Sequence, residues 1–171
     1  MDRARIAALE AAWQNRVPVT GAGEFWDWQP ADLGVFCDLL AAAVPHCPPG
    51  RTFCDVGCGI GTKCLLAEAA GVPAVGIDRV PEYLAEAKRL GVTVTLADAR
   101  TYRWYGPHGI VYVNHPLRDG AAEEVLERYI HAAMAPGAVL MAYNAGCFPP
   151  DGWCEITADR PAWRGVWVKA Q

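Results

Sequence analysis

Three glycines at alternating positions, opened by an acidic residue, are the part of this sequence best suited to chemistry. The run reads Asp55-Val-Gly-Cys-Gly-Ile-Gly-Thr62, and the short apolar stretch 52–56 leads into it. Glycine permits a tight turn, and it lets a ligand approach the backbone because no Cβ stands in the way. We therefore expect this loop to hold a ligand against its main chain.

Two more acidic residues stand at the ends of the next two apolar stretches. Asp78 closes the stretch 74–78, and Asp98 follows the stretch 92–97. A carboxylate at the first place would accept hydrogen bonds from both ribose hydroxyls of a nucleoside. One at the second place, beside Ala99, could accept from an adenine amino group. A single aspartate after a strand is often only a turn former or a helix cap, but three acids after three successive strands favour a ligand site.

The elements that must position these residues alternate between strands and helices. Apolar spacing predicts helices over 2–13, 31–44, 62–70, 81–90 and 121–134, and strands over 52–56, 74–78, 92–97, 110–114, 138–143, 154–157 and 165–169. Short connections between alternating strands and helices require a mostly parallel sheet, which is a doubly wound α/β fold. The last two strands have no helix between them and are expected to form an antiparallel hairpin. Such a sheet binds ligands at the carboxyl ends of its strands.

Four short motifs carry a resemblance to a known family. They are Asp55-Val-Gly-Cys-Gly-Ile-Gly61, Gly-Ile-Asp78, Ala-Asp98-Ala and Val-Asn114-His-Pro116. Together they resemble the motifs of the class I S-adenosylmethionine-dependent methyltransferases. The resemblance implies a Rossmann-like sheet of seven strands in the order 3-2-1-4-5-7-6, with S-adenosylmethionine as cofactor and S-adenosylhomocysteine as product.

The same resemblance implies a role for each part of the cofactor site. Asp78 would hold the ribose hydroxyls, Asp98 would lie near adenine, and the loop 55–61 would surround the methionine portion. The cofactor-binding residues expected on this basis are Asp55, Gly57, Cys58, Gly59, Gly61, Thr62, Asp78, Arg79, Asp98, Ala99 and Asn114.

A nicotinamide-dependent dehydrogenase is the main alternative for this glycine loop. Its motif is G-x-G-x-x-G, with the cofactor pyrophosphate on the N-terminus of the following helix. Here the spacing is G-x-G-x-G, and Asp55 precedes it. A carboxylate at that place would repel a pyrophosphate but suits a zwitterion that carries a sulfonium. The spacing therefore favours the methyl donor.

The fourth strand ends in residues that could bind a methyl acceptor. Amino-methylating members of the family often carry Asn or Asp here, then Pro-Pro and an aromatic residue. This sequence keeps Asn114 and Pro116 but has His and Leu at the other two positions. The missing aromatic weakens the case for a nucleobase, because stacking would be lost. Tyr112 or Tyr143 could replace it.

Asn114 and His115 are the candidate catalytic residues. Methyl transfer is a displacement at a reactive sulfonium, so much of the rate can come from positioning. A general base is optional for a neutral amine and useful for a hydroxyl. Imidazole exchanges protons near neutral pH, so His115 is the candidate base; the alternative is a histidine that only makes hydrogen bonds within its loop.

The segment before the first strand is rich in aromatic residues. Phe25, Trp26 and Trp28 lie in the stretch 24–29. They could form a lid that shields the site from water, together with Pro116 and Tyr143 on the substrate side. Alternatively, they anchor an N-terminal helix to the core.

Length and charge limit the classes of protein. The chain of 171 residues fits one domain, 1–171, with N-terminal helices and a candidate lid in 1–50 and the core in 51–171. A net charge of −4 does not favour nucleic acid as a partner, although it leaves one open. No apolar run reaches the ~20 residues of a membrane span. The oligomeric state is not indicated.

The seven cysteines and one acidic helix face complete the expectations. No secretory signal is recognisable, which predicts reduced thiols in the cytoplasm. The cluster Cys54, Cys58 and Cys64 has no CxxC spacing, so we expect structural thiols and no metal. In the helix 121–134 the apolar face is expected at Val125, Leu126, Tyr129, Ile130 and Ala133, and a solvated acidic face at Glu123, Glu124 and Glu127.

The sequence therefore predicts a methyltransferase that acts on a nitrogen or oxygen of a small molecule, a peptide or a protein. Two other functions remain open at this stage. One is a non-catalytic module that binds S-adenosylmethionine or serves as a partner subunit. The other is a nucleic-acid methyltransferase that relies on a separate specificity subunit.

Overall fold

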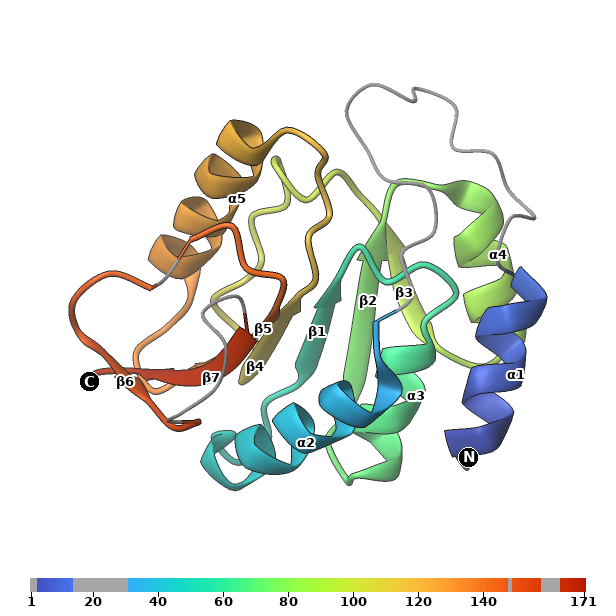
Figure 1. The fold of residues 1–171 in the computed structure, drawn as a ribbon, viewed down its shortest axis with the longest axis horizontal. Coiled ribbons are helices and arrows are strands. Elements are labelled where there is room, and N and C mark those ends of the chain that lie inside the picture. The colour runs from blue at the N-terminus through green and yellow to red at the C-terminus, as the bar shows by residue number, and fades with distance from the viewer. Residues whose placement is uncertain (1–2, 14–30, 148, 158–163) are drawn as a thin grey trace.

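The computed structural model describes residues 3–13, 31–147, 149–157 and 164–171, and these form one seven-stranded sheet with helices on both faces (Figure 1). The strands are β1 (Phe53–Val56), β2 (Ala74–Asp78), β3 (Thr93–Leu96), β4 (Ile110–Val113), β5 (Val139–Tyr143), β6 (Trp153–Glu155) and β7 (Arg164–Lys169). The helices are α1 (Arg3–Trp13), α2 (Leu33–Ala43), α3 (Thr62–Ala69), α4 (Pro81–Arg89) and α5 (Gly120–Ala133), and the short 3-10 helix η1 (Val44–His46) follows α2.

The strand order is β3-β2-β1-β4-β5-β7-β6, as the family resemblance implies. The strands from β1 to β5 are parallel to one another, and β7 pairs antiparallel with both β5 and β6. The chain order reverses at β1, because β2 lies on one side of it and β4 on the other. A ligand site is expected at this switch point.

The central strands are buried on both faces, so each contributes to two hydrophobic layers. In β1, Phe53 faces the layer that α1 to α4 cover, whereas Cys54 and Val56 face the layer that α5 covers. Figure 1 shows α5 set apart from the other four helices. Continuous apolar runs in β1, β4 and β5 follow from this double burial.

Helix α5 is rotated relative to the sequence prediction. Val125, expected on the inner face, is 69% exposed, whereas Glu123 and Glu127 are buried at 0% and 2% exposure. The prediction of a solvated acidic face was therefore wrong for these two residues. Leu126 and Ile130 pack against the sheet as expected. The carboxyl groups of Glu123 and Glu127 lie in the interior, where they accept hydrogen bonds from backbone N–H groups.

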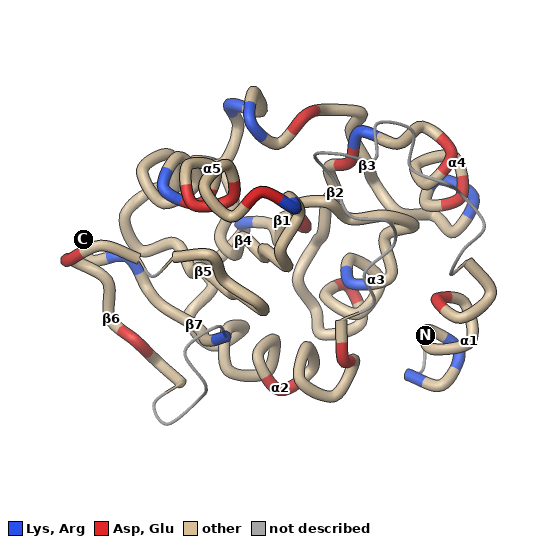
Figure 2. Tube along the Cα trace, turned by 45° about the horizontal axis from the view of Figure 1, so that its top comes forward, with Lys and Arg blue, Asp and Glu red and all other residues tan. Residues whose placement is uncertain are grey.

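Charged residues are spread along the chain rather than gathered in one basic region (Figure 2). Among the described residues, no helix combines the length and hydropathy that a membrane crossing needs. A search of the same residues finds no group of three or more His, Cys, Asp or Glu that could hold a metal ion.

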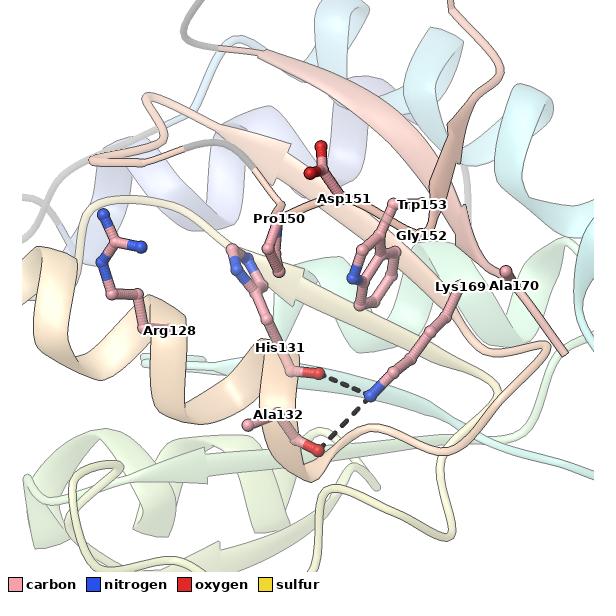
Figure 3. A pocket seen from close by; sticks show the side chains of 9 residues that line it. All are labelled: Arg128, His131, Ala132, Pro150, Asp151, Gly152, Trp153, Lys169 and Ala170. Carbon is pink, nitrogen blue, oxygen red and sulfur yellow. Dashed lines mark hydrogen bonds between the residues drawn. The ribbon is translucent and has the colours of Figure 1, made fainter.

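A lysine from β7 forms hydrogen bonds with the carbonyl groups at the C-terminal end of α5. The ammonium of Lys169 donates to the carbonyls of His131, Ala132 and Met134 at 2.8, 3.3 and 2.7 Å. It also lies over the Trp153 ring at 5.7 Å, on the wall of a pocket of about 390 Å³ (Figure 3). These carbonyls have no partner within the helix, and a cation also suits the negative end of the helix dipole.

We expect Lys169→Met to lower the free energy of unfolding by about 1–2 kcal/mol, because three carbonyls lose a charged donor. Urea denaturation measures the change. The matched control is Lys88→Met, in the last turn of α4 but exposed, which should change stability by less than about 0.5 kcal/mol. Equal effects of the two substitutions would show that the direct bonds contribute nothing.

Candidate functional site

The glycine loop after β1 needs glycine at each of its three alternating positions. Gly57, Gly59 and Gly61 have φ of 78°, 54° and 77°, in the left-handed region that side chains disfavour. A Cβ on Gly61 would also lie 2.9 Å from a methyl carbon of Val92. The loop then starts α3, with Gly61 as the residue before the helix.

Asp78, at the end of β2, holds the glycine loop in place. One carboxylate oxygen accepts the Gly59 N–H at 2.8 Å, and the other accepts the Val80 N–H at 2.9 Å. Burial raises the pKa of Asp78, and these N–H groups oppose the rise. The residue therefore fixes the loop as well as facing the ligand pocket, and only the second role was expected.

One pocket brings six of the expected cofactor or substrate residues together. It lies where β1, β2, β3 and β4 end, at the switch point of the sheet. Its walls are Gly57, Ile77, Asp78, Arg79, Ala97, Asp98, Ala99, Pro116 and Leu117. Two carboxylates from neighbouring strands thus face one space, bounded on its far side by the loop that follows β4.

Asp98 is an ionised wall of this pocket. The Arg100 guanidinium donates to Asp98 Oδ2 at 2.7 Å, and the Arg100 backbone N–H donates to Oδ1 at 2.9 Å. The side-chain bond from Arg100 is the main reason why the pKa of Asp98 is lowered. A charged carboxylate 30% exposed can still accept a further hydrogen bond from a ligand amino group.

A buried cluster of charges lies under the glycine loop. Glu10 of α1 accepts a hydrogen bond from the Thr62 hydroxyl at 2.6 Å and forms an ion pair with Lys63. Both partners of the pair are buried. Asp55 is buried close by; burial raises its pKa to about 7, and the charge of Lys63 opposes the rise. Glu10 was not among the expected site residues, although it ties the N-terminal helix to the donor loop.

The loops after β4 and β5 form a second group of polar side chains. Asn144, directly after β5, donates from its side-chain amide to Oδ1 of Asn114 at 3.2 Å. Among the described residues, His115 and Asn144 are the non-glycine residues with positive φ, 45° and 55°. Such conformations cost roughly 1–3 kcal/mol each and tend to occur at functional sites. Asn144 was not among the expected site residues. The signal that identified Asp78, a polar residue at the end of a predicted strand, applies to Asn144 as well.

Two buried carboxyl groups of α5 contact these loops. Glu123 accepts the Leu117 N–H at 2.8 Å, and its other oxygen lies 3.8 Å from His115 Nδ1. Glu127 accepts the N–H groups of Gly146 and Cys147 at 2.8 and 2.6 Å. Burial raises the pKa of Glu123 to about 8, and the Glu127 carboxyl adds to the rise.

The remaining expected residues are placed less directly at the site. Cys58 is buried, and its sulfur fills the space that a Cβ on Gly76 would need. Tyr143 is half-buried as the last residue of β5. Tyr112 cannot stack on an acceptor, because it is a core residue whose ring packs 5.0 Å from that of Phe36. The lid candidates Phe25, Trp26 and Trp28 lie outside the described residues.

Two characterised enzymes resemble the chain in sequence. It is 31% identical over 125 residues to trans-aconitate 2-methyltransferase of Methylobacterium nodulans, and 30% identical over 109 residues to 2-heptyl-1-hydroxyquinolin-4(1H)-one methyltransferase of Mycobacteroides abscessus. The matches cover 67% and 57% of this chain and 48% of each enzyme, so the chain spans about half the length of these relatives. A comparison with protein-family models finds no match.

Solved structures define the class of fold. An RNA methyltransferase from Salinibacter ruber in complex with S-adenosylhomocysteine has a TM-score of 0.61 at 17% identity, covering 84% of this chain and 95% of that one. CalS10, an amino pentose methyltransferase from Micromonospora echinaspora with S-adenosylmethionine bound, has a TM-score of 0.57 at 26% identity, covering 86% and 61%. The chain therefore has the fold of the class I S-adenosylmethionine-dependent methyltransferases. The resemblance to that family, expected from the four motifs, is confirmed.

The buried ion pair between Glu10 and Lys63 gives a stability test of how α1 is attached. Glu10→Met alone should lower the free energy of unfolding by about 3–5 kcal/mol, because it leaves Lys63 charged and buried without a partner. The double variant Glu10→Met/Lys63→Met should recover most of that loss. Urea denaturation of the single and double variants measures the coupling. Additive losses would mean that the two side chains do not depend on each other.

Proposed function

We propose that the chain binds S-adenosylmethionine and transfers its methyl group to a nitrogen or oxygen of a small molecule, a peptide or a protein. The observation that carries this proposal is the pocket at the switch point, where Asp78 and Asp98 face the same space beside the glycine loop. Similarity to methyltransferases in sequence and fold supports it.

The polar groups around the pocket suit the chemistry of the cofactor better than that of a dinucleotide. Asp78 can accept bonds from ribose hydroxyls, and Asp98 can accept one from the adenine amino group. Beneath the loop, Glu10 is paired with Lys63, and the negative charge that Asp55 carries when it is ionised suits a ligand with positive charge and would oppose a pyrophosphate. The three glycines leave the backbone open for close approach.

The acceptor would bind against the loops after β4 and β5. Bound S-adenosylmethionine supplies an electrophilic methyl group on its sulfonium. Asn114 Oδ1, which Asn144 already orients, can accept a hydrogen bond from an acceptor N–H or O–H. His115 can take the proton that an acceptor hydroxyl must lose, and Pro116 separates this loop from the glycine loop, 3.5 Å from where a Gly57 Cβ would be. Holding the acceptor in line supplies much of the rate enhancement.

Donor binding is tested by calorimetry with S-adenosylmethionine, S-adenosylhomocysteine and NAD. We expect the first two to bind, and Asp78→Asn to weaken binding on the order of a hundredfold, because charged hydrogen bonds to ribose are lost. The matched control is Asp119→Asn, at the N-cap of α5, where asparagine caps equally well and affinity should not change. Binding of NAD alone would overturn the proposal.

Transfer is tested separately, with Asn114→Ala. We expect this variant to keep its affinity for S-adenosylmethionine and to lose transfer of the labelled methyl group. The assay uses fractionated cell extract, scored for protein, nucleic acid and small molecules. A wild-type chain that binds the donor but labels nothing would support the non-catalytic module instead. Loss of donor affinity in the variant would place Asn114 on the donor side.

A further inference from the structure

Helix α5 sends two carboxyl groups, one turn apart, into the interior between the loops after β4 and β5. Glu123 and Glu127 are buried at 0% and 2% exposure. A buried carboxyl group is costly unless hydrogen bonds satisfy it. Backbone N–H groups of Gly146 and Cys147, from the second loop, satisfy both oxygens of Glu127. The Leu117 N–H, from the first loop, satisfies Oε2 of Glu123, whereas Oε1 of Glu123 is buried without a hydrogen-bond partner among the described residues. One helix is thus bonded to both loops of the acceptor side.

The loops that receive these bonds are held in unusual conformations. Each contains a non-glycine residue with positive φ, His115 in the first loop and Asn144 in the second. Such a backbone persists only where its surroundings impose it. The bonds from Glu123 and Glu127 fall within three residues of these positions, and the Asn144–Asn114 bond joins the two loops directly.

We propose that Glu123 and Glu127 are positioning residues for methyl transfer, holding the acceptor loops so that Asn114, His115 and Asn144 face one bound acceptor. This inference rests on the proposed function. Glu123 is also a neighbour of the His115 side chain, since its Oε1 lies 3.8 Å from Nδ1. Neither carboxyl group touches the substrate, because both lie inside the fold.

The protonation of Glu123 gives this arrangement a pH dependence. Burial raises the pKa of Glu123 to about 8, so at neutral pH it keeps its proton and lies beside Glu127 without two like charges meeting. The other titratable groups near the pair are His115 and Cys147, whose thiol pKa burial also raises. Above pH 8, Glu123 ionises, the two carboxylates repel each other, and the loops loosen.

Because its folded-state pKa is raised, the stabilisation from Glu123 is complete below about pH 4.5 and is lost as pH rises to about 8.

The test compares Glu123→Gln, Glu123→Ala and Glu127→Ala with the control Glu124→Gln. Glu124 is the adjacent acid on α5, but its side chain is 44% exposed and pairs with Arg128. We expect all four variants to bind S-adenosylhomocysteine within twofold of wild type. The two alanine variants should lose roughly tenfold to a hundredfold in transfer of labelled methyl groups into extract. Glu124→Gln should retain full transfer.

The pH profile distinguishes positioning from general support of the fold. In the wild type, transfer should fall above about pH 8, and the backbone amide signal of Leu117 should shift with the same midpoint in NMR spectra. Glu123→Gln keeps an oxygen for the Leu117 N–H but cannot ionise. It should retain transfer at pH 7 and lose both the alkaline fall and the amide shift, whereas Glu124→Gln should keep both.

Three results would overturn the inference. One is transfer by Glu123→Ala equal to that of Glu124→Gln. The second is an alkaline fall that persists in Glu123→Gln. The third is loss of S-adenosylhomocysteine binding together with transfer, which would place the effect on the donor side. If the wild type binds no S-adenosylhomocysteine, the proposed function fails, and the Leu117 amide titration still decides whether Glu123 holds the loop.

Discussion

Buried carboxyl groups that accept backbone N–H bonds hold the functional end of this molecule together. Loops at the carboxyl ends of parallel strands leave N–H groups unpaired, and a buried N–H without an acceptor is costly. Asp78 supplies acceptors to the glycine loop, Glu123 to the loop after β4, and Glu127 to the loop after β5. Each acid fixes a loop from a neighbouring element, so the shape of each loop depends on a residue outside it as well as on its own sequence.

The two sides of the sheet contribute to the site in different ways. On one side, α1 reaches the start of α3 through Glu10 and Lys63, beneath the donor loop. On the other, α5 reaches the loops after β4 and β5. The segment between β3 and β4, residues 97–109, contains no helix; there Tyr105 is buried against the sheet and donates to the Ala99 carbonyl at 2.9 Å. The wall beside Asp98 is thus a loop held by an aromatic core residue.

The motifs that carry the family resemblance are local patterns, and that resemblance implied the strand order and several of the residues that line the pocket. Glycines after a strand and acids at strand ends can be recognised residue by residue, which is why Gly57, Asp78 and Asp98 were found. Glu10 and Glu127 could not be found in that way. Their acceptor role depends on N–H groups and cations from distant segments, and an acid in a helix normally indicates a solvated face. The wrong prediction that Val125 faces the core has the same cause, because the buried face of α5 was assigned from its apolar residues alone.

The glycine loop and the loop after β4 meet at one narrow place. Gly57 has φ of 78°, and a Cβ there would stand 3.5 Å from the Cβ of Pro116. The glycine loop, held by Asp78, and the loop after β4, held by Glu123, therefore approach each other here with the Pro116 side chain between them. In the proposed reaction the methyl group would cross between these loops, and a small change in either one would alter the distance it travels. In-line transfer requires that both loops be held rigidly, and under the proposed function this requirement accounts for ionisable groups buried where apolar ones would pack at lower cost.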